Sequence, residues 1–161
     1  DDVGAIMPQV RNFDGSLQYA RRCLPTPLHL IMKRIAPNSK IASEYEIKNL
    51  EPKKPTEIIG ICGCFMIIRN SIISKINAFD ERYFMYFEDF DLARRIAQKS
   101  KVIYHPNIYI LHGSNREHVR NIKLFLYLIQ SAYKYFNKWG YYDNFRDKSN
   151  KQIIKNIIKN M

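Results

Sequence analysis

The stretch FDERYFMYFEDFDLARR, residues 79–95, combines aromatic side chains with five carboxylates and ends on two arginines. Aromatic residues favour burial, whereas carboxylates resist burial unless they are paired or functional. Glu88, Asp89 and Asp91 stand where an apolar helical pattern begins, and acidic residues in a first turn complement the helix dipole. Asp91 and Arg95 also have the i, i+4 spacing of an ion pair. A helix beginning near Glu88 is therefore predicted.

The same carboxylates also suggest a catalytic site. Three neighbouring carboxylates repel one another, and the aromatic residues around them restrict access of water; both effects raise the pKa of a carboxyl group. A raised pKa prepares a carboxylate to take a proton from a hydroxyl group as a general base. A surface helix start needs no such apolar surroundings, so we interpret the stretch as one wall of a catalytic cleft.

The residues before this stretch predict strands and one helix. VGAIMPQV, residues 3–10, predicts a short buried strand that ends near Pro8, and Asp14-Gly15 predicts a turn. Thr26 followed by Pro27 predicts the start of a helix that extends through residue 35. Residues 37–57 are polar and are interpreted as a long loop. IIGICGCFMIIR, residues 58–69, predicts a buried strand in which Gly63 allows a close approach to the backbone.

The residues after it continue the mixture of strands and helices. Asn70 is a candidate cap for a short helix, and KVIYHPNIYILH, residues 101–112, predicts two short strands separated by Pro106-Asn107. Residues 122–136 have the apolar spacing of a long amphipathic helix, whose apolar stripe we interpret as a core or interface face. Strands mixed with helices indicate an α/β domain.

Composition limits the partners and the compartment. The 161 residues carry 26 Lys and Arg against 15 Asp and Glu, a net charge of +11. Such a charge favours an anionic partner: nucleic acid, anionic lipid or a phosphorylated small molecule. No apolar run approaches the length of a membrane span, and the start lacks the features of an export signal. Three cysteines cannot all pair, which favours a reducing, cytoplasmic location.

Three segments together resemble a known family. They are VGAIMPQVRNFDGSLQYARR (3–22), GCFMIIRNSIISKINAFDERYFMYFEDFDLARRI (63–96) and VIYHPNIYILHGS (102–114). They resemble the second half of family 2 glycosyltransferases, in particular the bacterial rhamnosyltransferase-like group. The resemblance implies the C-terminal, acceptor-side part of a GT-A domain over residues 1–115, with a mixed sheet flanked by helices. Residues 116–161 would form a basic amphipathic helical extension.

The resemblance also implies roles for individual residues. The activity would be inverting transfer of a sugar from a nucleotide donor to an acceptor hydroxyl, with Asp89 as the catalytic base. The residues matching the acceptor site and its supports are Glu88, Asp91, Arg95 and Gly63. His112 matches a position that can ligate a divalent metal, Mg²⁺ or Mn²⁺, which would neutralise the leaving diphosphate.

One half of the family pattern has no counterpart here. The nucleotide-binding strands and the Asp-x-Asp metal motif are not found, and Asp1-Asp2 align with the segment that follows that motif. We therefore expect the chain to be part of a longer enzyme, to bind metal only with the missing half, and to be inactive alone. The expected partners are a nucleotide-sugar and a glycan or lipid-linked acceptor of surface polysaccharide synthesis, at the inner face of the cytoplasmic membrane.

Two other functions are compatible with the composition. A nucleic-acid-binding module is suggested by the net charge and by 20 Phe and Tyr residues, but no RNA- or DNA-binding signature accompanies them. We therefore expect no nucleic-acid partner. A non-catalytic subunit that binds a partner is the other alternative. The basic C-terminal stretch, residues 146–161, could contact an anionic membrane, the missing half or a second copy, or be a disordered tail.

Overall fold

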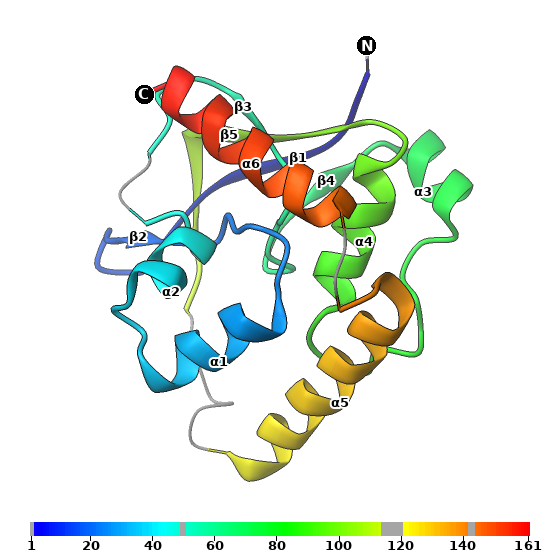
Figure 1. Cartoon of the computed structure of the whole chain (residues 1–161). Helices are drawn as coiled ribbons and strands as arrows, with labels where there is room; N and C mark the ends of the chain where they lie inside the picture. The colour runs from blue at the N-terminus through cyan, green and yellow to red at the C-terminus, as the bar shows by residue number, and fades with distance from the viewer. Residues whose placement is uncertain (1, 49–50, 114–120, 142–143) are drawn as a thin grey trace.

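The computed structural model describes residues 2–48, 51–113, 121–141 and 144–161. It confirms an α/β fold with a mixed sheet flanked by helices (Figure 1). The strands are β1 (Val3–Arg11), β2 (Leu17–Gln18), β3 (Thr56–Ile58), β4 (Ile67–Ile68) and β5 (Lys101–Leu111). The helices are α1 (Pro27–Ile35), α2 (Lys40–Tyr45), α3 (Asn70–Ile76), α4 (Glu88–Ala97), α5 (Ile122–Trp139) and α6 (Asn144–Lys159).

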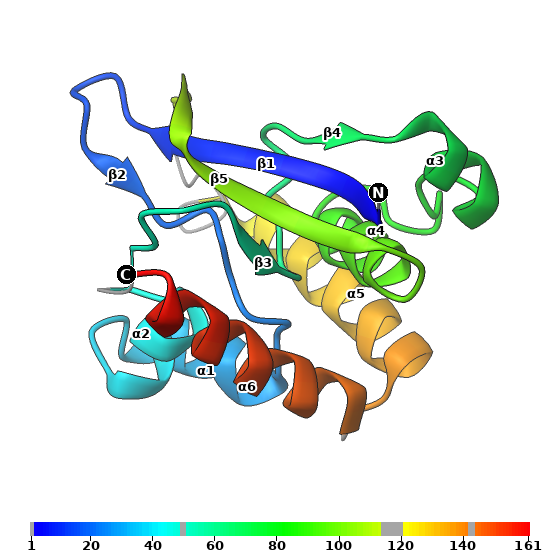
Figure 2. The ribbon, with the colours of Figure 1, turned by 90° about the horizontal axis from the view of Figure 1, so that it is seen from above.

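The sheet is built around two long strands. β1 and β5 run parallel, and Figure 2 shows them side by side through the middle of the sheet. The strand order is β2-β1-β5-β3, with β4 also pairing with β1, and every pairing other than β1 with β5 is antiparallel. Parallel strands are normally buried, which fits the apolar runs of β1 and of the first half of β5.

The prolines interrupt the strands less than the sequence predicts. β1 continues past Pro8, and residues 101–111 form one strand rather than two. The register explains both corrections: Pro8 lies opposite His105, and the next residue of β1 lies opposite Tyr109. β5 therefore has three extra residues, 106–108, at this point. Proline cannot donate a ladder hydrogen bond, and a bulge of this kind accommodates it.

The prediction of one buried strand over residues 58–69 is wrong. Its ends lie in β3 and β4, and an irregular segment joins them. Gly60 explains part of the change, because a Cβ atom there would lie 2.1 Å from the backbone carbonyl oxygen of Arg22. The segment thus makes a close backbone contact instead of continuing the ladder. The loop predicted at residues 37–57 also contains more secondary structure than expected, namely α2 and the start of β3.

The helix starts were predicted more accurately. Thr26 caps α1, accepting a hydrogen bond from the backbone N–H of His29 at 3.0 Å. α4 begins at Glu88 as expected. Asn70 is the first residue of α3 rather than its cap, because Arg69 occupies the cap position. A side chain can cap a helix only if its own residue has the non-helical backbone conformation that precedes the first turn.

The two C-terminal helices share the core with the sheet. Tyr135 and Phe136 of α5 and Ile153 and Ile157 of α6 belong to the same buried cluster as the strands. Asn150 of α6 also donates to and accepts from the backbone of Leu24, at 3.0 and 2.8 Å. Over its described residues the C-terminal stretch is therefore a packed helix. Within the described ranges, no helix is both long and apolar enough to cross a membrane.

The predicted apolar stripe of α5 is only partly buried. Phe136 is buried, but most of the remaining stripe is exposed: Ile122, Leu126, Ile129 and Tyr133. α1 has no buried residue, and its exposed apolar side chains are Leu28, Ile31 and Ile35. Both helices lie at the bottom of the view in Figure 1, below the sheet. Of the two interpretations of the stripe, an interface is favoured over a core.

Candidate functional site

The backbone just before α4 adopts an unusual conformation. Tyr86 and Phe87 both have a φ of 67°, in the left-handed region that bulky residues rarely enter. Each such residue costs about 1–2 kcal/mol. Phe87 is held in place by packing, since its ring contacts those of Phe90, Tyr135 and Phe136 with centroids 5.2–6.2 Å apart. Phe87 thus belongs to a buried aromatic cluster that fixes the strained turn at the start of α4, whereas Phe79 and Phe84 of the same motif are exposed.

Asp89 follows this turn and is half-buried. Its Oδ2 accepts a hydrogen bond from the backbone N–H of Gly63 at 3.0 Å, and its Oδ1 accepts one from the N–H of Phe90 at 2.8 Å. Burial raises the pKa of Asp89, although these two hydrogen bonds and the charge of Arg22 act in the opposite direction. Among the described residues, no cation lies within ion-pair distance of this carboxylate.

Glu88 provides a second carboxyl group beside Asp89. It is half-buried, and its Oε2 atom has no hydrogen-bond partner among the described residues. Burial raises the pKa of Glu88, and the neighbouring charge of Asp89 raises it further. Of the three carboxyl groups that the sequence places at the start of α4, Glu88 and Asp89 therefore lie side by side with raised pKa values.

Gly63 is flanked by two half-buried thiols. The hydrogen bond from Cys64 lowers the pKa of Cys62 to about 6; burial opposes this shift and Arg22 adds to it. All three cysteines, Cys23 included, are free. Across the described ranges, His, Cys, Asp and Glu nowhere gather in a group of three that could hold a metal ion.

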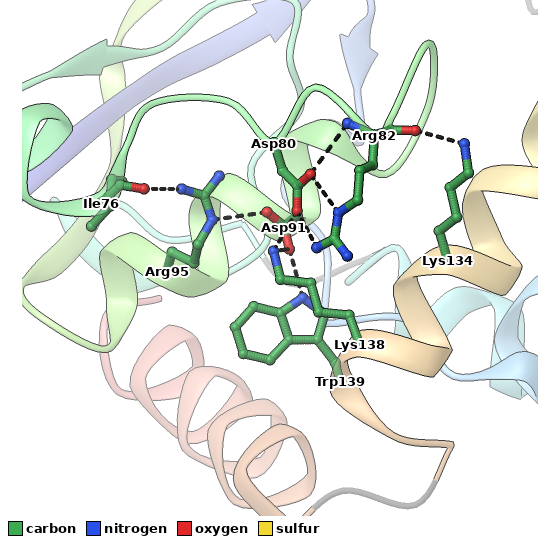
Figure 3. Close-up of polar contacts among 8 residues, drawn as sticks. All are labelled: Ile76, Asp80, Arg82, Asp91, Arg95, Lys134, Lys138 and Trp139. Carbon is green, nitrogen blue, oxygen red and sulfur yellow. Dashed lines mark hydrogen bonds and ion pairs between the residues drawn. The ribbon is translucent and has the colours of Figure 1, made fainter.

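Asp91 lies deeper in the protein and is fully buried (Figure 3). Its Oδ2 accepts from Arg95 Nε at 2.8 Å, which confirms the predicted i, i+4 ion pair. Its Oδ1 accepts from the indole N–H of Trp139 and lies beside Lys138 Nζ, each at 2.7 Å. Because Trp139 and Lys138 belong to α5, Asp91 links the motif helix to α5.

The same network reaches the start of the motif. Lys138 Nζ also lies 2.7 Å from Asp80 Oδ2, and the guanidinium of Arg82 contacts both oxygens of Asp80. The hydrogen bonds from Arg82, followed by those from Lys138, lower the pKa of Asp80 well below its usual range. Lys134 of α5 donates to the carbonyl oxygen of Arg82 at 2.6 Å. Sequence reasoning missed these α5 residues because they lie some 50 positions away and carry no local signal.

His112 follows β5 and makes contacts separate from those of Asp89. Its backbone N–H donates to Arg11 O at 2.9 Å, and its Nδ1 lies 3.2 Å from Gln18 Oε1. The Gln18 amide also donates to the His112 carbonyl oxygen. A donating Nδ1–H would leave Nε2 with a free lone pair, the arrangement typical of metal-binding histidines. Sequence reasoning missed Gln18, which positions this ring from β2, on the far side of β1 from β5.

The structure therefore divides the predicted site residues into three groups. It brings Asp89, Glu88 and Gly63 together at the start of α4. It places Asp91 and Arg95 in the buried network with α5. It places His112 at the end of β5 beside Gln18. In the first group, burial raises the pKa of both carboxyl groups, and Glu88 Oε2 has no partner among the described residues, as expected of groups that exchange protons.

Comparison with known proteins gives three relatives. The chain is 31% identical over 115 residues to proteins named N-acetylglucosaminyl-diphospho-decaprenol L-rhamnosyltransferase in two strains of Mycobacterium tuberculosis. The match covers 68% of this chain and 37% of each relative. It is 28% identical over 102 residues to Rhamnosyltransferase WbbL of Escherichia coli K12, covering 63% of this chain and 34% of that protein.

The chain thus spans little more than a third of the length of the curated relatives that it matches. No protein-family profile matches the chain. No solved structure matches it either. The names of the relatives support a relationship to glycosyltransferases in the broad sense.

Proposed function

We propose that this chain is the acceptor-side part of an inverting glycosyltransferase of family 2, with Asp89 as the catalytic base. The observation that carries the proposal is the state of Asp89: a half-buried carboxylate with a raised pKa, fixed by a backbone N–H and without an ion-pair partner in the described part of the chain. The similarity to rhamnosyltransferases supports the same activity independently.

The proposed reaction is a single displacement. The acceptor hydroxyl oxygen forms a bond to the anomeric carbon of the donor sugar, the hydroxyl proton passes to an Asp89 oxygen, and the bond from the anomeric carbon to the diphosphate breaks. A base is most effective when its pKa lies near the working pH. Burial moves the pKa of Asp89 in that direction, and the Gly63 N–H keeps one oxygen oriented.

The neighbouring residues would support this base in different ways. Glu88 has a buried oxygen without a partner in the described ranges, which suits a hydrogen bond to an acceptor hydroxyl. Asp91 and Arg95 are engaged with each other and with α5, so we assign them to positioning the start of α4. Gly63 would leave room for the acceptor beside Asp89, because it is exposed and carries no side chain.

A divalent metal would neutralise the diphosphate leaving group in such a reaction. His112 is the residue of this chain that would help to hold it, with Gln18 fixing its ring. Mg²⁺ and Mn²⁺ take several oxygen ligands, and no group of three suitable ligands converges in the described part of the chain. We propose that His112 shares the metal with ligands from outside that part, and that sugar transfer requires them.

The relatives suggest which substrates to test first. Their names specify a rhamnosyl donor group and, for the mycobacterial proteins, an N-acetylglucosaminyl-diphospho-decaprenol acceptor. We propose the same classes for this chain: a nucleotide-activated deoxysugar and a lipid-linked acceptor of surface polysaccharide synthesis.

A lipid-linked acceptor would bring the protein to a membrane, and α1 and α5 are suited to that contact. Both expose apolar side chains, and exposed cations lie among them, including Arg34 and Lys123. The Arg34 guanidinium stacks 4.4 Å from the centre of the Phe125 ring, which joins the two helices. α6 is less suited than its sequence suggests, because Ile153 and Ile157 are buried. Apolar side chains among cations favour anionic interfaces.

Vesicle flotation tests this contact. We expect the combined change Ile31→Ser and Leu126→Ser to reduce the fraction bound to anionic vesicles, because binding at an interface increases with the apolar area that is buried there. Ile158→Ser is the matched control, since Ile158 is equally exposed but lies on α6. Equal loss in the control, or none in the double variant, would contradict the assignment.

The catalytic proposal is tested by Asp89→Asn in the full-length enzyme. We expect transfer to fall by a factor of about 10²–10⁴, with binding of the nucleotide-sugar donor unchanged. Glu81→Gln is the matched control, because it neutralises an exposed carboxylate of the same motif. Unchanged transfer by Asp89→Asn would refute the base assignment.

A further inference from the structure

Arg22 lies near Asp89 and is bound through its backbone to the segment that holds Gly63. Its backbone N–H donates to the carbonyl oxygen of Gly60 at 3.1 Å, in an isolated antiparallel bridge. The position is tightly constrained, since a Cβ atom on Gly60 would lie 2.1 Å from the Arg22 carbonyl oxygen. Three residues beyond Gly60, the N–H of Gly63 binds the Asp89 carboxylate. The backbone of Arg22 is therefore fixed to the segment that orients Asp89.

The side chain of Arg22 is half-buried. Its Nε atom is buried and has no hydrogen-bond partner in the described part of the chain. Its guanidinium acts electrostatically on Asp89, Cys62 and Tyr45, yet none of the ion pairs found among the described residues involves it. Glu46, another electrostatic neighbour, is already paired with two lysines at 2.8 and 2.9 Å.

Four other arginines with buried nitrogens are engaged within the protein. Each has at least one strong contact elsewhere on its side chain: Arg21 with Glu51, Arg95 with Asp91, Arg146 with Asp147, and Arg94 with the ring of Trp139. A buried guanidinium nitrogen without a partner is costly, and the half-buried Arg22 side chain remains accessible to a ligand. An anionic ligand that binds Arg22 would offset this cost.

We propose that the guanidinium of Arg22 binds a diphosphate oxygen of the substrate that approaches Asp89. This inference rests on the proposed function and adds the anionic part of the substrate to it. Without a cation nearby, the acidic groups of Asp89, Glu88 and Cys62 would repel an anionic substrate. Arginine suits this task because its planar fork of donors matches the geometry of phosphate oxygens.

Two substrates could supply this diphosphate. One is the nucleoside diphosphate of the donor, and the other is the diphosphate that joins an acceptor sugar to its lipid. The recognition chemistry is the same for both, so binding assays must distinguish them. Suitable probes are inorganic pyrophosphate for the shared group, thymidine diphosphate for the donor side and geranyl diphosphate for the acceptor side.

The test is isothermal titration of the 161-residue chain with each probe. We expect Arg22→Met to weaken pyrophosphate binding about tenfold and Arg22→Lys, which keeps the charge but not the fork, to weaken it less. Arg34→Met is the matched control, because it removes the same charge from an exposed position. Whichever of the two organic diphosphates loses affinity in Arg22→Met identifies the source.

Several outcomes would overturn the inference. They are failure of the wild-type chain to bind pyrophosphate, wild-type affinity in Arg22→Met with an unchanged circular dichroism spectrum, and equal loss in Arg34→Met. Failure of this inference is distinguishable from failure of the base assignment. If Asp89→Asn abolishes transfer while Arg22→Met binds normally, only the role of Arg22 is wrong; the reverse pattern refutes only Asp89.

Discussion

Asp89 and Asp91 stand two positions apart on α4 and have opposite surroundings. Asp91 is fully buried and bound by Arg95, Lys138 and Trp139. Asp89 is half-buried, is held by backbone N–H groups, and has a pKa raised by burial. Residues two positions apart on an α-helix are separated by about 200° around its axis. The two carboxylates therefore point to opposite sides of α4.

The difference shows how one acidic motif can serve two purposes. A carboxylate whose oxygens are all engaged by protein cations is fixed in place and contributes to packing. A carboxylate with spare acceptor capacity can still exchange a proton or bind a substrate. We therefore interpret the network around Asp91 as the support and the region around Asp89 as the reactive part.

The largest expected effect comes from removing the charge of Asp91. Asp91→Asn leaves Arg95 and Lys138 without their buried counter-charge, and breaking a buried pair in this way costs about 3–5 kcal/mol. Denaturant unfolding of the variant should show this loss of unfolding free energy. Asp89→Asn should change stability by less than about 1 kcal/mol at neutral pH, because no ion pair is broken. If Asp89→Asn destabilised the protein as strongly as Asp91→Asn, the contrast between the two carboxylates would be lost.

A smaller effect is expected at the α5 end of the same network. Trp139→Phe keeps most of the aromatic ring but removes the indole N–H that donates to Asp91 at 2.7 Å. A hydrogen bond to a charged group contributes about 1.5–3 kcal/mol, and the unfolding free energy should fall by that amount. Tyr141→Phe is the control, because its hydroxyl makes a long 3.4 Å contact at the exposed end of α5. If Trp139→Phe lowered the unfolding free energy by less than the control does, Trp139 would not stabilise the network around Asp91.

The pH dependence of stability should differ in sign between the two regions. Because the pKa of Asp89 is raised on folding, the folded state holds its proton longer, and this contribution to stability is lost as pH rises from the ordinary value of 3.8 through the raised value. For Asp80, whose pKa is lowered by Arg82, the contribution is present above 3.8 and is lost as pH falls through the lowered value.

Denaturant midpoints measured at several acid pH values test these signs. The difference in unfolding free energy between wild type and Asp89→Asn should decrease with rising pH, whereas the difference between wild type and Asp80→Asn should increase. A difference that is flat or rising for Asp89→Asn would show that this carboxylate is not desolvated on folding.

The smallest effect on stability is expected at Gly63. An added Cβ would lie 3.4 Å from the Asp89 Cβ, an ordinary van der Waals distance, and the N–H that binds Asp89 would remain. Gly63→Ala should therefore change the unfolding free energy by less than about 0.5 kcal/mol while reducing transfer by narrowing the space beside Asp89. Gly60→Ala should instead cost about 1–3 kcal/mol, since its Cβ would meet the Arg22 carbonyl at 2.1 Å. Equal stability losses would refute the proposed difference between the glycines.

Much of the fold and part of the site could be predicted from local pattern. The cap at Thr26, the start of α4 at Glu88 and the pairing of Asp91 with Arg95 all depend on residues within four positions. The segment 58–69 could not be predicted in this way, because its apolar composition is typical of a strand while its path is set by contact with Arg22. The bulge at residues 106–108 likewise depends on which residues of β1 lie opposite.

The sequence by itself determined the elements and the presence of a carboxylate cluster within an aromatic stretch, because side-chain periodicity and capping act over one or two helical turns. Only the tertiary structure decided which carboxylate is engaged and which is available. Lys138 and Trp139 reach Asp91 from α5, and Gly63 reaches Asp89 from the segment between β3 and β4. The chemical state of a buried carboxylate depends on the charges and donors that surround it in space, and in this protein they come from distant parts of the chain.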